Sequence, residues 1–368
     1  MVNYDVIVVG AGPAGSSTAR YSTLGGAKTL LLDKKVNIGE PVRCGEFIPA
    51  NSELQNFFSP AKEGIEELFN FPSNLITQKI EIVHLFSPTG KLYEFPLEGY
   101  TVERKWFDKY LVEEASKAGA IIKTGERVIR LEENRVVTEK ETYETKVIIG
   151  ADGPSSLVAH CTGLPLNDEY ALCAQYVMDD LAIEPEVVEM YSGKIAPGAY
   201  AWIIPKGKDC ANVGVGIRRR FAGQVSLRGL LEYFVDGFPY TRDKFLKGRI
   251  VSFVTGLVPT GGSFEQTVRN NTLLVGDAAG QVLPITGGGI PTAMLCGRIA
   301  GRVASRYILG ECKLSDYEGL WRKELGKNFF SVWRRCKKFE WLLYSNFTLE
   351  LFLKVLGKKG IEKLIKLK

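Results

Sequence analysis

The residues of this chain that point first to chemistry are a glycine cluster, Gly10-x-Gly12-x-x-Gly15, and the acidic Asp33. The cluster follows an apolar strand and opens a helix of small residues. There Gly10 permits a tight turn, Gly12 lets the backbone approach a pyrophosphate, and Gly15 lets helix and strand pack closely. Asp33 lies 23 residues after Gly10, where a carboxylate accepts from a ribose hydroxyl. The pattern predicts a dinucleotide site; the alternative is a glycine-rich turn in an ordinary α/β protein.

Two further Gly/Asp motifs follow later in the chain. Asp152-Gly153 ends an apolar run, and Gly276-Asp277 ends another and is followed by Gly289-Ile290. Each alone fits an ordinary turn, because Asp-Gly pairs are common turn chemistry. Three such motifs in this order are not expected by chance, so we expect them to build one site.

Hydrophobic periodicity predicts the elements that position these motifs. Alternating runs at 80–87 and 91–97 predict an antiparallel hairpin, and apolar residues at helical spacing predict a helix over 103–118. Short strands with Pro/Gly turns between about 166 and 265 predict a mostly antiparallel sheet in a separate layer. The further expected elements are strands at 5–9, 120–124, 146–150 and 271–276, a long helix at 289–309, and helices beyond 312.

Composition sets the broad class. The 368 residues are 45% hydrophobic and 24% charged, which is typical of soluble globular proteins. No apolar stretch is long enough for a transmembrane helix, and the N-terminus leads directly into a strand, so we expect a cytoplasmic protein. The seven cysteines form no C-x-x-C pair and the two histidines, His84 and His160, are isolated, so no metal site is predicted. A Cys312–Cys336 disulfide stays open.

The three glycine motifs and two further segments together resemble a known family. The three glycine motifs resemble those of FAD-dependent aromatic-hydroxylase-type flavoproteins. The run from Pro197 to Pro205 (PGAYAWIIP) is similar to the PxxYxWxFP signature of geranylgeranyl reductases, with Ile204 in place of Phe. The loop from Arg43 to Glu46 resembles the RCGE loop of the archaeal members. These enzymes saturate the isoprenoid chains of digeranylgeranylglycerophospholipids, the precursors of archaeal membrane lipids.

The resemblance implies a fold, a division of the chain and a cofactor. The fold class is α/β (α+β), a Rossmann-like FAD-binding domain interrupted by an antiparallel β-sheet substrate domain. The FAD-binding domain takes residues 1–75, 100–165 and 268–310, the substrate domain 76–99 and 166–267, and a helical basic region 311–368. Phe47 stands where the archaeal loop tends to have Gly. The implied FAD contacts are Gly10, Gly12, Ala14, Gly15, Asp33, Cys44, Gly45, Arg104, Val128, Asp277, Gly289 and Ile290.

The reaction implied by the resemblance needs a proton donor and electron-rich surfaces. No carbonyl activates an isolated alkene, so hydride delivery from flavin N5 must be coupled to protonation while positive charge builds on carbon. Cys44 is the predicted donor, since a free thiol is mostly protonated near neutrality; Arg43 is expected to lower its pKa. Tyr200 and Trp202 alternate on one strand and are expected to line the tunnel and stabilise the cation. The alternatives are a small buried cysteine and two core aromatics.

The tail from residue 313 to 368 holds the basic character of the chain, with 14 Lys/Arg against 6 Asp/Glu, in a chain of net charge +5. Aromatic and aliphatic residues at helical spacing lie between the basic clusters. Such a helix either lies on a membrane surface, peripherally, or closes the substrate domain with its apolar face. We expect no nucleic-acid partner. No second dinucleotide fingerprint is present, so ferredoxin or a transiently bound NAD(P)H is expected as electron donor.

Competing functions remain. An isoprenoid quinone or geranylgeranyl diphosphate would enter a similar tunnel. An FAD-dependent aromatic monooxygenase of the same fold would use O2 and NAD(P)H instead. A flavin-bearing lipid carrier would need no chemistry, but the intact Cys44 and aromatic motif argue against it.

Overall fold

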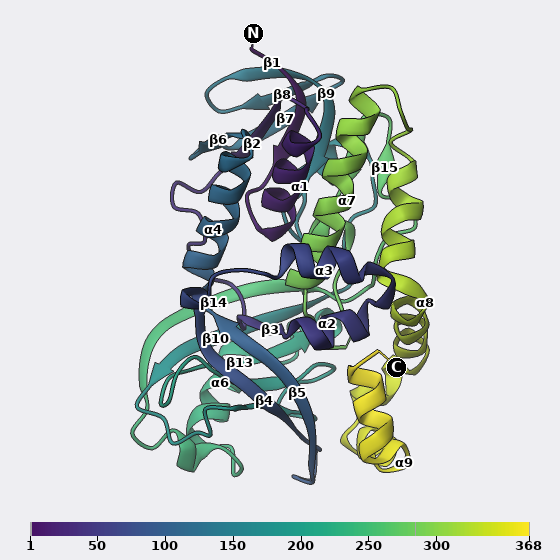
Figure 1. Ribbon diagram of the computed structural model, residues 1–368. Helices are drawn as coiled ribbons and strands as arrows, with labels where there is room; N and C mark the ends of the chain where they lie inside the picture. Colours follow the sequence, from purple (N-terminus) through teal and green to yellow (C-terminus); the bar gives the residue numbers. More distant parts are fainter. Residues whose placement is uncertain (1, 284, 368) are drawn as a thin grey trace.

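Two eight-stranded sheets organise the molecule, one above the other in Figure 1. The computed structural model describes residues 2–283 and 285–367, apart from the side chains of Val2, Asn328 and Cys336, so the Cys312–Cys336 pairing lies outside the described part. The mixed α/β class and the helical C-terminal region are confirmed. The division into domains stays a prediction; β3, in the segment assigned to the FAD-binding domain, pairs within the second sheet.

The first sheet has a parallel centre built from apolar runs that are buried on both faces. The neighbour order is β15-β16-β9-β1-β2-β6, with the β7–β8 hairpin attached to β9. Val9 pairs with both Leu32 and Gly150, so these strands end at the same edge and bring their following motifs together. Its strands are β1 (Val2–Val9), β2 (Thr29–Asp33), β6 (Ile121–Thr124), β7 (Val128–Glu132), β8 (Arg135–Thr138), β9 (Thr142–Gly150), β15 (Val268–Arg269) and β16 (Thr272–Leu274).

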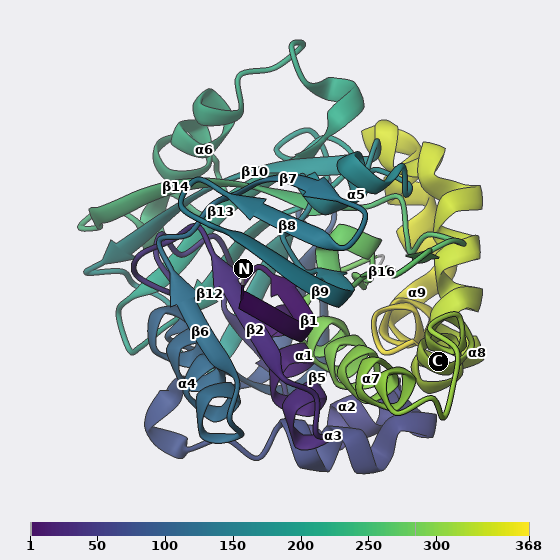
Figure 2. The ribbon, with the colours of Figure 1, turned by 90° about the horizontal axis from the view of Figure 1, so that it is seen from above.

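Three helices cover one face of this sheet, as Figure 2 shows: α1 (Pro13–Leu24), α4 (Arg104–Lys117) and α7 (Ile290–Ile308). The β7–β8 hairpin and the short α5 (Leu157–Thr162) contribute to the core on the other face. The helices α1 and α7 pack closely through glycine: a Cβ on Gly297 would stand 2.4 Å from the Ala14 carbonyl oxygen, and one on Gly301 2.5 Å from that of Thr18. The two helices therefore run in the same direction.

The second sheet is mostly antiparallel, in the order β14-β10-β13-β12-β11-β4-β5-β3, as the Pro/Gly-punctuated pattern predicts. Its apolar face packs against α6 (Leu227–Asp236), a helix that the sequence analysis missed. Its other face turns toward the first sheet. Its strands are β3 (Phe47–Pro49), β4 (Ile76–Phe86), β5 (Leu92–Val102), β10 (Tyr170–Asp179), β11 (Val187–Tyr191), β12 (Ala201–Pro205), β13 (Ala211–Arg218) and β14 (Arg249–Pro259).

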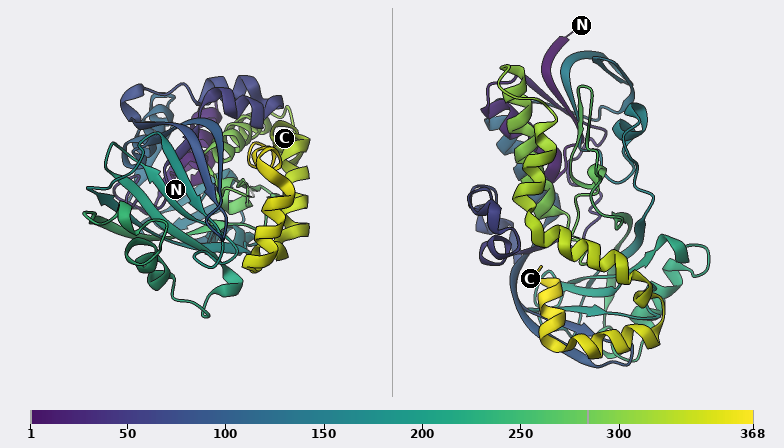
Figure 3. Two further views of the ribbon diagram at one scale, coloured as in Figure 1. Left: turned by 90° about the horizontal axis from the view of Figure 1, so that it is seen from below. Right: turned by 90° about the vertical axis from the view of Figure 1, so that its right-hand side faces the viewer.

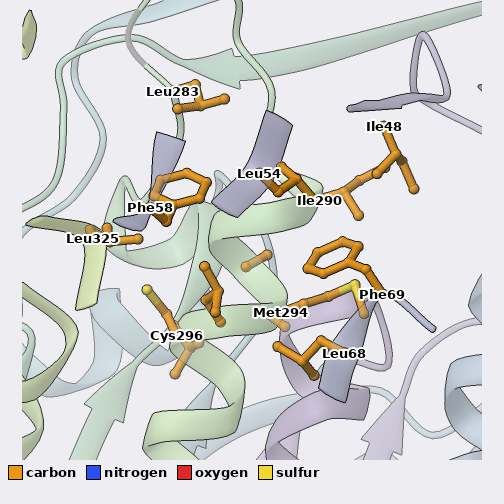
Figure 4. Close-up of a cluster of buried hydrophobic side chains, with 14 of the residues drawn as sticks. Ile48, Leu54, Phe58, Leu68, Phe69, Leu283, Ile290, Met294, Cys296 and Leu325 are labelled. Carbon is orange, nitrogen blue, oxygen red and sulfur yellow. The ribbon is translucent and has the colours of Figure 1, made fainter. Parts of the chain in front are cut away.

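Helices from distant parts of the chain share one core beside α7. The sequence analysis assigned no element to α2 (Asn51–Phe57) or α3 (Lys62–Leu68), which supply Leu54 and Leu68 to this cluster. Figure 4 shows these side chains around Met294 of α7. The helices α2, α3 and α7 therefore belong to one hydrophobic core.

The C-terminal helices cross both sheets along one side of the molecule (Figure 3). They are α8 (Asp316–Phe339), a 3-10 segment at Glu340–Tyr344 and α9 (Asn346–Ile365). Trp333 donates to the Gly261 carbonyl at 3.1 Å, and the Glu350 carboxylate accepts from the Thr89 N–H at 3.3 Å. No helix in the described part of the chain is long and apolar enough to cross a membrane.

A Gly→Ala substitution in the contact between α1 and α7 is expected to have the opposite effect to one at an open position in α8. Gly297→Ala should destabilise the protein by about 1–3 kcal/mol, because the methyl group meets a backbone carbonyl. Gly319→Ala in α8 is the control, since a Cβ there has no atom within 4 Å, and it should stabilise by about 0.5–1 kcal/mol. Calorimetric melting temperatures measure both; an unchanged melting temperature for Gly297→Ala would contradict the close packing.

Candidate active site

The glycine fingerprint forms an open cradle at the carboxyl edge of the first sheet. Gly10 has φ of +103°, and a Cβ there would stand 2.3 Å from the Ala151 carbonyl oxygen. A Cβ on Gly15 would stand 1.8 Å from the Gly10 carbonyl oxygen, so close packing excludes a side chain at both positions. Gly12 has no such neighbour within 4 Å and faces open space. This side of the turn has room for a pyrophosphate.

Asp33 lies at the end of β2, next to the cradle. Its carboxylate accepts from the Ala11 N–H at 2.7 Å and from the Lys35 N–H at 2.8 Å. The backbone carbonyl of Asp33 accepts from the Glu126 N–H, two residues before the buried Val128. The structure therefore brings Asp33 and the start of β7 to one end of the cradle.

A second helix N-terminus lies beside the first. Gly12 and Gly289 are the N-caps of α1 and α7, and neither helix start has a side-chain cap. A Cβ on Gly276 would stand 2.8 Å from that of Ala14, which makes Ala14 a packing residue. Two positive dipole ends that lack a side-chain cap suit a bound diphosphate. Ile290 lies in the adjoining core.

Asp277 stands against the start of α7. A Cβ on Gly289 would lie 3.1 Å from its Oδ1. Burial raises the pKa of Asp277 to about 6, and the charge of Arg104 opposes that increase only in part. The carboxyl group of Asp277 is thus costly to ionise in the chain alone. Asp152 of the second motif is instead a structural cap, because it accepts from the Ser156 hydroxyl at 2.6 Å and from the Val158 N–H at 3.1 Å.

Arg104 connects the cradle with the loop around Cys44. Its guanidinium binds Asp108 in bidentate fashion at 2.8 and 2.9 Å, and its backbone N–H donates to Glu46 Oε1 at 2.8 Å. The guanidinium also lies near enough to Cys44 and Asp277 to affect the pKa of each. Arg104 is therefore the one predicted contact residue that reaches both halves of the site.

The thiol of Cys44 corrects one expectation from the sequence. Burial raises its pKa, and the arginine that opposes this increase is Arg104, not the adjacent Arg43, whose side chain is exposed. The expectation that Arg43 lowers the pKa is wrong, because the Arg43 side chain is exposed to solvent and burial of the thiol outweighs the charge of Arg104. The Glu46 N–H donates a hydrogen bond to Cys44 Sγ, with the two heavy atoms 3.1 Å apart. At neutral pH this thiol holds its proton.

Tyr200 and Trp202 meet edge to face, with ring centroids 5.8 Å apart. Tyr200 lies one residue before β12, and its hydroxyl donates to the Thr286 carbonyl, in the segment that leads to α7. Burial raises its pKa. The indole N–H of Trp202 donates to Gln175 Oε1 at 3.1 Å. The second sheet thus presents both aromatic residues toward the segment between Asp277 and α7.

The structure gathers the predicted residues into two neighbouring groups. The cradle group is Gly10, Gly12, Ala14, Gly15, Asp33, Val128, Asp277, Gly289 and Ile290, and the loop group is Cys44, Gly45, Arg104, Tyr200 and Trp202. Sequence reasoning missed three buried or half-buried polar residues beneath the loop group, Gln175, Asn212 and Lys206. The available signal in the sequence is the pair Gly214 and Gly216, which lie two residues apart on one strand. They indicate that one face of this strand carries no side chains at these positions.

Comparisons with known proteins show which family this chain resembles. Residues 169–258 match the family model described as the geranylgeranyl reductase catalytic domain. The digeranylgeranylglycerophospholipid reductase of Methanocaldococcus jannaschii is 39% identical over 356 residues, which are 92% of this chain and 84% of that protein. The structure of a geranylgeranyl bacteriochlorophyll reductase-like protein of Thermoplasma acidophilum superimposes with a TM-score of 0.85 at 28% identity, over 99% and 96% of the two chains.

More distant structures define the class by fold alone. A myxobacterial FAD-dependent halogenase, at 15% identity, gives a TM-score of 0.74 over 98% of this chain and 91% of its own. The fold is that of this class of flavoproteins. Within it, the chain belongs to the geranylgeranyl reductase family, and it is an oxidoreductase that acts on carbon–carbon double bonds.

The pKa of Asp277 predicts how its replacement changes stability with pH. Because the pKa is about 6 in the folded protein and lower in the unfolded chain, the contribution of Asp277 to stability falls as pH rises toward 6. Asp277→Asn stays neutral, so in the FAD-free protein its melting temperature relative to the native protein should increase from pH of about 4 to 6 and then level off. The exposed Asp236→Asn controls for the lost charge. A difference independent of pH would contradict the prediction.

Proposed function

We propose that this chain is an FAD-dependent reductase that saturates geranylgeranyl chains on an archaeal ether phospholipid, digeranylgeranylglycerophospholipid. The supporting observation is the half-buried thiol of Cys44, whose pKa is raised by burial, grouped with two aromatic side chains beside a dinucleotide cradle. The named relatives act on this substrate according to their names.

FAD fits the residues that are present. Gly12 would face the pyrophosphate of FAD, and Asp33 would face its ribose. The uncapped start of α7, near Asp277, would face the other half of FAD. When bound and reduced, FAD would supply the hydride. The buried carboxyl of Asp277 has a raised pKa in the chain alone, which is consistent with a polar partner that arrives with the cofactor.

The protein's own contribution is the proton and the surroundings of the reacting carbons. The Tyr200 hydroxyl already donates a hydrogen bond to the Thr286 carbonyl, and the Trp202 N–H donates one to Gln175. Neither side chain therefore has a free hydrogen-bond donor. The thiol of Cys44 is the remaining donor of the three, and its raised pKa keeps the proton on sulfur until it is needed. The ring faces of Tyr200 and Trp202 stabilise positive charge that builds on carbon.

An anaerobic single-turnover assay tests this function. Dithionite-reduced holoenzyme should be reoxidised by digeranylgeranylglycerophospholipid without O2, and mass spectrometry should show two hydrogens added per reduced bond. Geranylgeranyl diphosphate and a prenylated quinone are run in parallel to rank the substrates. Ferredoxin and NAD(P)H are then compared as physiological donors. Reoxidation that needs O2 and yields a hydroxylated product would instead identify a monooxygenase.

Cys44→Ala should slow alkene reduction about 10²–10⁴-fold, the range that general acid catalysis contributes. Binding of FAD should persist, because the glycine cradle and Asp33 are untouched. The exposed Cys161→Ala, in α5, is the matched control and should retain native turnover. Turnover equal to the native rate in Cys44→Ala would remove this thiol from the mechanism.

The C-terminal helices support a second part of the proposal, contact with a membrane surface. One face of α9 is buried through Leu349 and Leu353, so this helix does pack against the protein. Phe347, Leu351 and Val355 form a separate stripe at i, i+4 and i+8, and the ends of this stripe are 77% and 78% exposed. Lys354 lies next to this stripe, and Lys358 and Lys359 follow beyond the kink at Gly357. An exposed apolar stripe beside basic residues suits an anionic lipid surface.

Replacing the ends of this stripe should weaken membrane binding without harming the fold. Phe347→Asp/Val355→Asp is expected to bind vesicles containing phosphatidylglycerol about 10- to 100-fold more weakly in flotation assays, since two apolar side chains lose their burial in lipid. The matched control is Leu309→Asp, an exposed apolar residue at the opposite end of α7. The proposal would be contradicted if the double variant bound as strongly as the native protein. It would also be contradicted if the native protein bound only to neutral phosphatidylcholine vesicles.

A further inference from the structure

Three neighbouring strands place Trp202, Gly214 and Gln175 in one row across the second sheet. Trp202 pairs with Gly214 between β12 and β13, and Gly214 pairs with Gln175 between β13 and β10. Residues in register share a face of the sheet. A Cβ on Gly214 would stand 2.2 Å from the indole ring, so the ring lies over this glycine and reaches Gln175. The bare strand position makes the contact between Trp202 and Gln175 geometrically available.

We propose that Gln175 and Asn212 are positioning residues for Cys44, and that Trp202 acts on the reaction through its N–H bond to Gln175 as well as through its ring. This inference rests on the proposed function, in which Cys44 donates the proton. It assigns a role to two side chains on strands that do not touch the glycine motifs.

The two amides use every N–H they have. Gln175 donates to the Cys44 carbonyl at 3.0 Å and to Asn212 Oδ1 at 3.1 Å. Asn212 donates to the Gly45 carbonyl at 3.2 Å and to Glu46 Oε2 at 2.8 Å. Both residues are buried, and a buried amide that lacks a partner is costly. The consecutive carbonyls of Cys44 and Gly45 are thereby fixed against the second sheet.

Trp202 sets the direction of this network. An indole N–H only donates, so it requires the oxygen of the Gln175 amide on its side. The NH2 group of Gln175 must then face the Cys44 carbonyl, as the bonds require. Without the indole N–H, the Gln175 amide keeps its two donor bonds, but its buried oxygen loses its partner. Trp202 therefore completes the hydrogen bonding of the amide that holds the Cys44 carbonyl.

Glu46 closes the network on the other side of the loop. It is fully buried with φ of +68°, and it accepts from the Arg104 N–H as well as from Asn212. Lys206 pairs with its Oε2 at 2.6 Å and with Glu103 at 2.9 Å. The backbone of the Cys44 loop is thus held from three elements.

Two conservative variants of the holoenzyme test the proposal. Trp202→Phe keeps an aromatic face without the N–H, and Gln175→Glu keeps the acceptor for Trp202 without the donor to Cys44. Both should lower kcat about 10- to 100-fold, with KM changed less, because the proton donor is misplaced. Both should also shift the pH midpoint of Cys44 alkylation by iodoacetamide downward, since a released loop admits water to the thiol. Peptide mapping assigns the alkylated residue.

Trp321→Phe is the matched control, because Trp321 is also buried and also donates its indole N–H, to Thr267 at 3.3 Å, within the α8 core. It should leave both kcat and the alkylation midpoint as in the native enzyme. A native kcat and a native midpoint in Trp202→Phe would overturn the proposal; if that variant does not fold, Gln175→Glu decides in the same way. Alkylation needs no substrate, so a shifted midpoint in an enzyme that reduces no prenyl lipid would refute the function and keep the positioning role.

Discussion

The burial of the Glu46 carboxylate is the constraint on which the site depends. This group is fully buried, and its partners come from three separate parts of the chain: the N–H of Arg104 at the start of α4, the amide of Asn212 on β13, and the ammonium of Lys206. Removing one member of a buried ion pair typically costs about 3–5 kcal/mol. The loss of any of these partners would therefore leave a buried charge uncompensated at the Cys44 loop.

A second constraint is the close approach of α1 and α7. Glycine at 297 and 301 brings the two helices together, and as a result their uncapped N-termini lie side by side at the carboxyl edge of the first sheet. The arrangement suits a diphosphate, but it leaves the carboxyl of Asp277 buried with little compensation in the chain alone. A group that is costly to ionise in the chain alone is typical of a site built for a ligand.

The sequence predicted those features that a local pattern encodes. Glycines at 10, 12 and 15 are required by backbone contacts within one strand–turn–helix unit, and α4 and the β4–β5 hairpin follow from hydrophobic periodicity. The pKa of Cys44 was misjudged because the neighbouring arginine in the chain, Arg43, points to solvent, whereas Arg104 approaches in space. Gln175 and Asn212 could not be predicted, since a polar residue within an apolar strand gains its meaning only from the register of β10 against β13. The helix α6 was missed in a region where strand signals dominate.

The pairing of Arg104 with Asp108 explains how a thiol next to an arginine keeps its proton. A free guanidinium beside Cys44 would favour the thiolate, as cations do at reactive cysteines. Here both Nε and Nη2 are engaged by the carboxylate one helical turn away, so much of the positive charge is balanced before it reaches the sulfur. Burial then dominates, and the pKa of the thiol rises. In the proposed mechanism the cysteine acts in its acid form, and the pairing of Arg104 with Asp108, together with burial, is consistent with that form.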